Sequence, residues 1–310
     1  MDYKVERLLV SPTPHIHSVL TTRMIMLDVI IAMCPALIAS VIIFGLRALL
    51  VVAVTVAACV GFEYLWNRIM HQPQTIGDLS AIITGMLLAF NMPVDIPLYM
   101  PIIGSLAAII MTKALFGGLG HNFANPAIVG RIVLAVSFPA YMASVVVPKA
   151  FQACDAISAA TPLAVIDEEI PFMDLFLGTH GGMVGETCSL ALLIGFGWLL
   201  YTHIIEATIP LIFVGVVAVM SLLCGHNPIN EIFSGGLLLG AIFMATDYTT
   251  SPFNRKGKII FAIGCGLITA VIRFWGNMNE GVSYSILLMN LLVPFINEKT
   301  RRKPVGGVKR

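Results

Sequence analysis

One polar segment of this chain carries hydroxyl groups in surroundings that suit covalent chemistry. Residues 155–163 read Asp-Ala-Ile-Ser-Ala-Ala-Thr-Pro-Leu, which places the Asp155 carboxylate and the Ser158 and Thr161 hydroxyls among small side chains. Small residues let another molecule approach the backbone closely, and the Thr161 hydroxyl can be esterified. The alternative for these residues alone is an ordinary turn capped by Ser158. We therefore treat Thr161 as a candidate attachment site.

A second polar segment, 117–126, reads Gly-Gly-Leu-Gly-His-Asn-Phe-Ala-Asn-Pro and separates two apolar runs. Asn125 before Pro126 is typical of a helix N-cap with proline at the first helical position. The exposed amides of such a helix start can receive an anionic or carbonyl-rich ligand. Lys113 and Arg131 flank the segment and would offset the charge of that ligand. The alternatives are a glycine turn for close helix packing, and basic side chains that extend to the membrane surface.

Three acidic residues stand in or beside apolar runs, where charged side chains are costly and usually mark function. For Glu63 we expect an ordinary ion pair with Arg68 near an interface. Asp28 fits an ion path and such a pairing equally well. Asp247 follows a short apolar run and is the better candidate for a polar site.

The sequence contains no metal-binding or nucleotide-binding motif. Its six cysteines are scattered without a CxxC pair or a Cys/His cluster, and no Rossmann glycine fingerprint is present. Cys154 and Cys188 bracket one loop, where a disulfide and two free thiols are equally compatible with the sequence. We expect no metal site, no NAD or ferredoxin site and no catalytic residue in this chain by itself.

The elements that must position these residues are membrane helices. The chain has 310 residues, of which 58% are hydrophobic and 11% are charged, whereas soluble domains carry about 25% charged residues. Its mean hydropathy is +0.91. The first 23 residues are polar and lack the apolar core of a cleavable signal peptide. We expect a polytopic protein of the lipid bilayer with no nucleic-acid partner.

Two apolar segments, 79–91 and 235–246, are too short to cross a bilayer, which takes about 20 residues. Short segments leave backbone polar groups at membrane depth, where protein or a lined cavity must satisfy them. Their matching places in the two halves of the chain predict a site at the centre of an inverted repeat. The alternative is two ordinary spans whose ends are counted wrongly. In all, the apolar runs predict ten segments near 24–46, 48–66, 79–91, 97–116, 127–147, 189–203, 207–224, 235–246, 257–275 and 282–297.

The predicted fold is therefore all-α, with ten transmembrane segments in two inverted five-segment repeats that contain discontinuous short helices. Its five parts are a cytoplasmic N-terminal segment 1–23, a first repeat 24–147, an outer-face loop 148–188, a second repeat 189–297 and a basic cytoplasmic tail 298–310. This topology places 15 of the 18 Lys and Arg residues at cytoplasmic ends, as the positive-inside rule requires. Within the outer loop, we expect a short amphipathic helix at the membrane interface, over residues 172–177.

Several motifs carry a resemblance to a known family. Segment 155–161 is similar to the motif at which a flavin transferase joins FMN to threonine through a phosphoester. Segments 14–18, 26–29 and 117–127 are also similar to those of the family. The resemblance covers nearly the whole chain. It is to the D subunit of the Rnf complex, an ion-translocating ferredoxin:NAD oxidoreductase, and to the related B subunit of the Na⁺-translocating NADH:quinone reductase.

The resemblance implies covalent FMN on Thr161, with Asp155 and Ser158 as the elements that the transferase reads. Ala159 stands where many family members have glycine, which would strain a loop that needs positive φ there. The resemblance also implies a second, non-covalent flavin, riboflavin, inside the subunit. For that flavin, the candidate residues are those of the glycine loop, namely Gly118, Gly120 and Asn122.

The resemblance further implies a subunit of the bacterial plasma membrane, with both termini cytoplasmic and the Thr161 loop on the outer face. Its partners would be the other subunits of the complex, especially an outward-facing FMN subunit, and the flavin transferase. Electrons from reduced ferredoxin would pass through FMN on Thr161 towards NAD, coupled to export of Na⁺ or H⁺. Two alternatives are the quinone-reducing relative and a channel without redox function, because urea and ammonium channels also contain an inverted five-helix repeat. The sequence assigns neither the coupling ion, the ion path, the order of carriers nor the position of the riboflavin.

Overall fold

The computed structural model describes residues 21–146, 158–159, 171–276 and 281–301, and nearly all of their regular structure is helical. The helices before the long loop are α1 (Thr22–Phe44), α2 (Leu46–Ile69), η1 (Ile76–Asp78), α3 (Ser80–Phe90), α4 (Tyr99–Leu106), η2 (Ala107–Lys113), η3 (Ala114–Phe116), α5 (Pro126–Ser137) and α6 (Pro139–Met142). Those after it are α7 (Phe172–Leu177), α8 (Ser189–Tyr201), α9 (Thr208–Cys224), α10 (Pro228–Phe233), α11 (Leu237–Leu239), η6 (Gly240–Met244), α12 (Arg255–Trp275) and α13 (Val282–Thr300). Strands β1 (Val145–Val146) and β2 (Ser158–Ala159) form one short antiparallel pair.

Each of the ten predicted segments contains helix, and α7 occupies the residues predicted for the short amphipathic helix. The fifth segment is shorter than predicted, because α5 ends at Ser137 rather than near residue 147. The cause is Pro139, since a residue that precedes proline is disfavoured in the helical conformation. Phe138 accordingly adopts φ −134° and ψ 58°.

Four described helical stretches are long and apolar enough to cross a membrane by themselves: Thr22–Phe44, Leu46–Ile69, Tyr99–Phe116 and Arg255–Trp275. Shorter apolar helices of 10–17 residues accompany them at Ser80–Phe90, Pro126–Ser137, Ser189–Tyr201 and Thr208–Cys224. Large apolar side chains also point outward from these helices, among them Ile42, Leu46 and Leu223, each more than 70% exposed. Outward-facing apolar side chains on apolar helices fit a multi-pass membrane protein.

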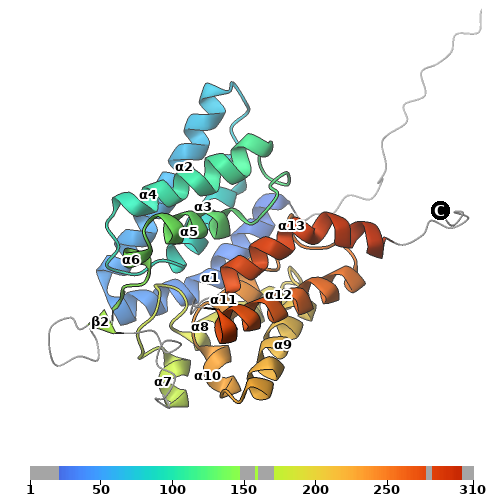
Figure 1. Ribbon diagram of the computed structural model, residues 1–310. Coiled ribbons are helices and arrows are strands. Elements are labelled where there is room, and N and C mark those ends of the chain that lie inside the picture. Colours follow the sequence, from blue (N-terminus) through green and yellow to red (C-terminus); the bar gives the residue numbers. More distant parts are fainter. Residues whose placement is uncertain (1–20, 147–157, 160–170, 277–280, 302–310) are drawn as a thin grey trace, which may run out of the picture.

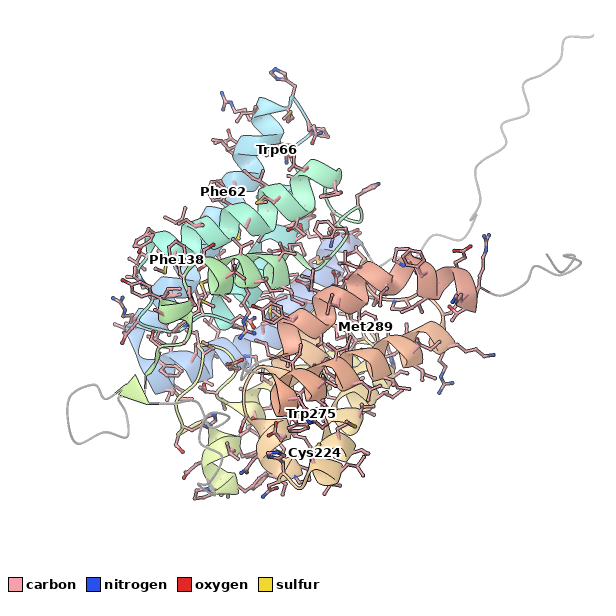
Figure 2. The ribbon with its side chains drawn as sticks, viewed as in Figure 1. Phe62, Trp66, Phe138, Cys224, Trp275 and Met289 are labelled. Atoms are coloured by element: carbon pink, nitrogen blue, oxygen red, sulfur yellow. The ribbon has the colours of Figure 1, made fainter. Side chains whose placement is uncertain are left out.

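The helices gather in two groups that meet along the middle of the molecule. Figure 1 shows α2 to α5 on one side, α9 to α13 on the other, and α1 between them. Contacts of α1 with α8 and of α5 with α13 link the helices before the long loop to those after it. The labelled side chains of Figure 2 follow this division, with Trp66 near the far end of α2 and Met289 on α13. The buried core is continuous across the two groups.

The end of the short helix α3 is buried, so its last carbonyl groups need partners. The Val184 amide donates to the carbonyl oxygen of Met92 and the Gly185 amide to that of Phe90, both at 3.0 Å. The Asn91 side chain donates to the carbonyl oxygen of Leu87 at 2.6 Å. The chain that follows the long loop therefore satisfies the backbone where α3 stops.

The second short segment, 235–246, also has a distant hydrogen-bond partner at its end. Helix η6 is a wide π-helical turn, a form that occurs often at functional sites. At the last residue of this helix, the Asn125 side chain donates from Nδ2 to the carbonyl oxygen of Met244 at 3.3 Å. Both short segments are thus completed by side chains or backbone from distant parts of the chain.

Candidate functional site

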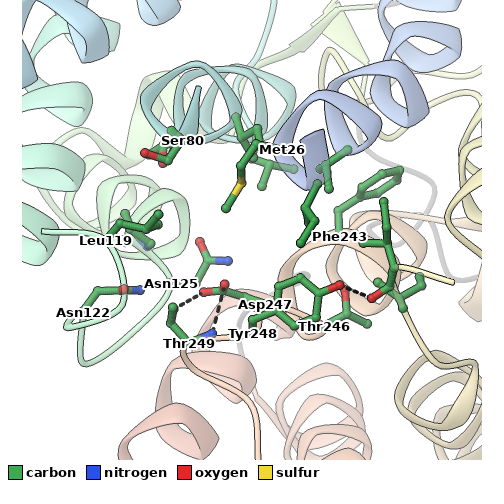
Figure 3. Close-up of a pocket in the computed structure, with 18 of the residues that line it drawn as sticks. Met26, Ser80, Leu119, Asn122, Asn125, Phe243, Thr246, Asp247, Tyr248 and Thr249 are labelled. Atoms are coloured by element: carbon green, nitrogen blue, oxygen red, sulfur yellow. Dashed lines mark hydrogen bonds between the residues drawn. The ribbon is translucent and has the colours of Figure 1, made fainter. Parts of the chain in front are cut away.

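A pocket lies between the two groups of helices, where the second short segment ends. Its lining comes from α1, from α3, from residues 119–126 and from the residues at and after the end of η6. Figure 3 shows Met26 of α1 and Ser80 of α3 on one side, across from Asp247 and Thr249 on the other. Most of the lining is apolar, with a few polar groups that converge on the space, a composition typical of cofactor and ligand sites.

Asp247 supplies the acidic wall of this pocket. Its carboxylate accepts hydrogen bonds from the hydroxyls of Thr249 and Thr250, each at 3.0 Å, and from the Thr249 amide at 3.4 Å. Burial raises the pKa of Asp247, and hydrogen bonds from Thr249, Thr250 and Asn122 act against that rise. Asp247, the predicted polar-site residue, therefore lies in the lining of a pocket.

The glycine loop, residues 117–126, contributes its asparagines to the lining of the pocket but not the predicted glycines. Asn122 and Asn125 both line the pocket, whereas Gly118 and Gly120 are absent from its lining. The two glycines have φ of +90°, a conformation that L side chains rarely adopt, so they shape the loop that presents the asparagines.

The predicted helix start at Asn125 is confirmed. Asn125 is the N-cap of α5, and its Oδ1 accepts from the Ala127 amide at 3.0 Å. Pro126 occupies the first helical turn. Because Asn125 also bonds to Met244 and lines the pocket, one side chain connects the start of α5, the end of η6 and the cavity.

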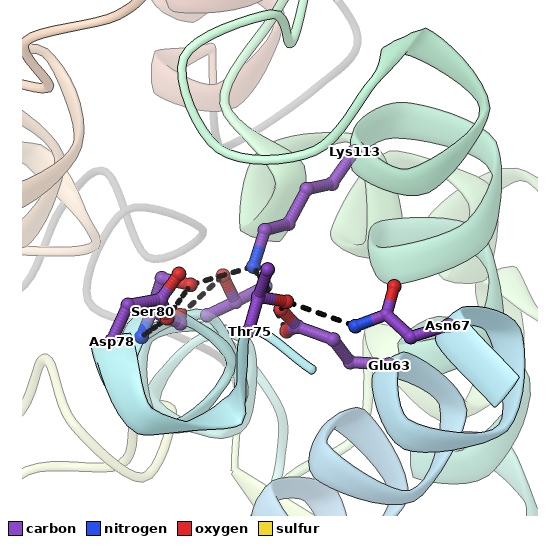
Figure 4. A network of polar contacts seen from close by, with 7 residues as sticks. Glu63, Asn67, Thr75, Asp78, Ser80 and Lys113 are labelled. Carbon is purple, nitrogen blue, oxygen red and sulfur yellow. Dashed lines mark hydrogen bonds and ion pairs between the residues drawn. The ribbon is translucent and has the colours of Figure 1, made fainter. Parts of the chain in front are cut away.

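Glu63 and Lys113 form a buried ion pair on the side of the pocket opposite Asp247. Lys113 Nζ lies 3.0 and 2.9 Å from the two carboxylate oxygens of Glu63 and donates to Ser80 Oγ at 2.6 Å (Figure 4). The predicted ion pair between Glu63 and Arg68 is wrong, because Arg68 instead donates to the Tyr64 hydroxyl at 3.0 Å. The lysine is 4% exposed, so it does not extend to the membrane surface.

Arg131 is likewise buried rather than directed to the surface. It donates to Asn91 Oδ1 at 2.8 Å and to Ser283 Oγ at 2.9 Å, which ties α5 to the end of α3 and the start of α13. Sequence reasoning gave no role to Glu186, which is 3% exposed and interacts electrostatically with Arg131. The sequence signal that could have identified Glu186 is its position as an acidic residue between Gly185 and Thr187 in an otherwise apolar stretch.

The predicted attachment segment is described only in part. Asp155 and Thr161 lie outside the described residues, as does Cys154, the possible partner of Cys188. Ser158 and Ala159 form β2, whose extended backbone suits alanine, so the absence of glycine at position 159 causes no strain. Within the described part of the chain, no three His, Cys, Asp or Glu side chains gather as metal ligands.

Comparison with known proteins gives a consistent result over almost the whole chain. The profile of the NQR2, RnfD, RnfE family matches residues 9–306. The chain is 45% identical to the D subunit of the Na⁺-translocating ferredoxin:NAD⁺ oxidoreductase complex of Acetobacterium woodii, covering 97% of this chain and 96% of the relative. It is 38% identical to the D subunit of the proton-translocating ferredoxin:NAD⁺ oxidoreductase complex of Clostridium ljungdahlii, covering 96% of each. It is 34% identical to the D subunit of the ion-translocating oxidoreductase complex of Stutzerimonas stutzeri, covering 91% of each.

Proposed function

The chain belongs to the NQR2, RnfD, RnfE family, and we propose that it is the D-type membrane subunit of an ion-translocating ferredoxin:NAD oxidoreductase. The observation that carries this proposal is the 45% identity over nearly the full length of both chains. In the complex, this subunit relays electrons between ferredoxin and NAD while Na⁺ or H⁺ crosses the membrane. It depends on its sister subunits for the sites at which ferredoxin and NAD react.

The electron carrier that we propose for the outer face is FMN, joined to Thr161 through a phosphoester. The motif around Asp155 and Ser158 supports it, and so does the extended backbone at Ala159, which removes the objection to alanine there. When bound, the flavin supplies one- and two-electron chemistry, while the protein supplies its position. A short covalent tether would keep the flavin at an effective concentration of about millimolar.

The pocket is the site that we propose for a second, non-covalent flavin. Asn122 and Asn125 offer amide groups that can bind the polar edge of an isoalloxazine ring, and Asp247 offers an acceptor. Met26 and Phe243 offer apolar surface for its faces.

We further propose that the ten helical segments form two inverted repeats that cross the bacterial plasma membrane. The packing supports this because like positions meet: the first segments, α1 and α8, pack together, and so do the fifth, α5 and α13. Both third segments are short, because α3 spans Ser80–Phe90 and α11 with η6 spans Leu237–Met244. The charge distribution supports cytoplasmic termini and an outer loop that bears Thr161.

The proposal is tested by replacing the attachment residue in cells that express the whole complex with its flavin transferase. The wild-type subunit should leave a fluorescent flavin band on a denaturing gel, and Thr161→Ala should abolish it. Ser144→Ala is the matched control, because Ser144 is an exposed hydroxyl before the same loop. A band that survives Thr161→Ala would place the flavin elsewhere, and a wild-type subunit without a band would remove covalent flavin from the proposal.

The redox assignment is tested separately from the attachment. Membranes that contain the complex should reduce NAD with reduced ferredoxin. Activity with NADH and a quinone instead would indicate the quinone-reducing branch of the family. A colourless subunit without activity in either assay would favour a channel.

A further inference from the structure

The ion pair between Glu63 and Lys113 is unusual because both residues are 4% exposed within apolar helices. A buried pair of this kind seldom adds net stability, since apolar residues of similar volume often serve as well or better. Charged residues at membrane depth are retained mainly where they serve function. Stability of the helix packing alone therefore does not explain why the pair is present.

The pair has a definite orientation relative to the pocket. Lys113 belongs to the lining and Glu63 does not, so the positive end of the pair faces the cavity. The ammonium group uses its three donors on the two Glu63 oxygens and on Ser80 Oγ. Ser80 is held in turn by Asp78, to which its hydroxyl donates at 2.6 Å. Lys113 is thus fixed in place and acts on a ligand through its electric field rather than through a further hydrogen bond.

The pocket contains little other charge. Among its described lining residues, Lys113 and Asp247 are the charged ones, and Figure 3 shows Ser80, which holds Lys113, across the space from Asp247. A ligand in the pocket lies between the fixed Lys113 cation and the Asp247 side chain. Charges act strongly on one another where burial lowers the effective dielectric constant. The energy of the ligand therefore depends on any charge that it gains or loses.

We infer that Lys113 raises the reduction potential of a flavin bound in this pocket and that Glu63 moderates the effect. The inference rests on the proposed non-covalent flavin. Electrons that reach a flavin ring ahead of protons place negative charge on it, and the nearby ammonium group stabilises that reduced form. Glu63 lies behind Lys113 and partly cancels its field. The two side chains are therefore expected to shift the potential in opposite directions.

The test uses the full-length chain, purified in detergent with Thr161→Ala as background so that covalently attached flavin is absent. The remaining dissociable flavin is titrated with dithionite and followed by its visible absorbance. Lys113→Met should lower its midpoint potential and Glu63→Gln should raise it. Loosened packing around the pocket would instead move both variants in the same direction. Lys258→Met, which removes a positive charge from a more exposed ion pair with Glu206, is the control and should leave the potential unchanged.

A double variant guards against misfolding, because each single variant leaves one buried charge unpaired. Glu63→Gln with Lys113→Met removes both charges, and its potential should be lowered by less than that of Lys113→Met. Unchanged potentials, or shifts of one sign in both single variants, would overturn the inference while leaving the flavin site intact. A background protein that contains no dissociable flavin would overturn the pocket assignment itself, and the inference with it. Quantification of released flavin distinguishes these two failures.

Discussion

The close contact between α1 and α8 gives a prediction whose size can be worked out from the structure. Gly195 of α8 lies against α1, and a methyl group on it would overlap the carbonyl oxygen of Ala32 and lie 3.0 Å from Cζ of Phe243. A backbone carbonyl cannot turn aside as a flexible side chain can. Gly195→Ala should therefore force the two helices apart, and overpacking of this kind costs about 1–3 kcal/mol.

The same helix contains a matched control. Around Gly197, an added methyl group would meet no described atom within 4 Å. Both substitutions share the gain in helix propensity from glycine to alanine, about 1 kcal/mol. The difference in unfolding free energy between the two variants therefore isolates the steric cost, and Gly195→Ala should be the less stable by about 1–3 kcal/mol.

Equilibrium unfolding of the purified chain in mixed detergent micelles, followed by circular dichroism, measures this difference. The two variants should also differ in the exchange of backbone amides along α1, because only the first disturbs that contact. Equal stability of the two variants would show that α1 and α8 do not pack as described. It would also remove one of the contacts that support the paired repeats.

Three further predictions follow from buried polar groups. Asn125→Ala removes the N-cap of α5 and the bond to Met244, so unfolding experiments should show a loss of about 1–3 kcal/mol, whereas a neutral result would contradict both contacts. Glu231→Gln leaves Arg273 without the carboxylate that lies 3.0 Å from its Nη1, and the same assay should show a loss of about 3 kcal/mol; Glu206→Gln, at the more exposed pair, should cost much less. Burial raises the pKa of Asp247 above its ordinary value of 3.8. Protonation of Asp247 therefore stabilises the folded state fully below pH 3.8, and this stabilisation is lost as the pH rises through the raised pKa. The stability of wild type relative to Asp247→Asn should therefore fall as pH rises, and a constant difference would contradict the burial.

Local sequence features predicted the helical segments and the start of α5 well. Apolar runs bounded by turns set where helices form, and the Asn-Pro pair at position 125 specifies its own cap through a contact two residues away. The residues of α7 were predicted as a short amphipathic helix, and the structure begins that helix after Pro171 and ends it before Gly178, which adopts the left-handed conformation. The end of α5 was missed because the apolar pattern continues past Pro139, although proline is a local signal that favours an earlier end.

Contacts between distant segments were not predictable in the same way. Glu63 pairs with Lys113, 50 residues away, rather than with Arg68 on its own helix, because the packing of η2 against α2 brings the lysine to it. Asn122 and Asp247 were each identified as polar candidates, but nothing in the sequence indicated that they line one pocket. Such sites depend on how the two groups of helices meet, which no local pattern records.

The central claim is that this subunit is a redox carrier with flavin on the outer loop. Intact-mass spectrometry of the subunit from the assembled complex, with peptide mapping, tests it most directly. We expect the mass of the chain plus one FMN joined through a phosphoester, with the modified peptide containing Thr161. An unmodified chain in a complex that reduces NAD with ferredoxin would contradict the claim.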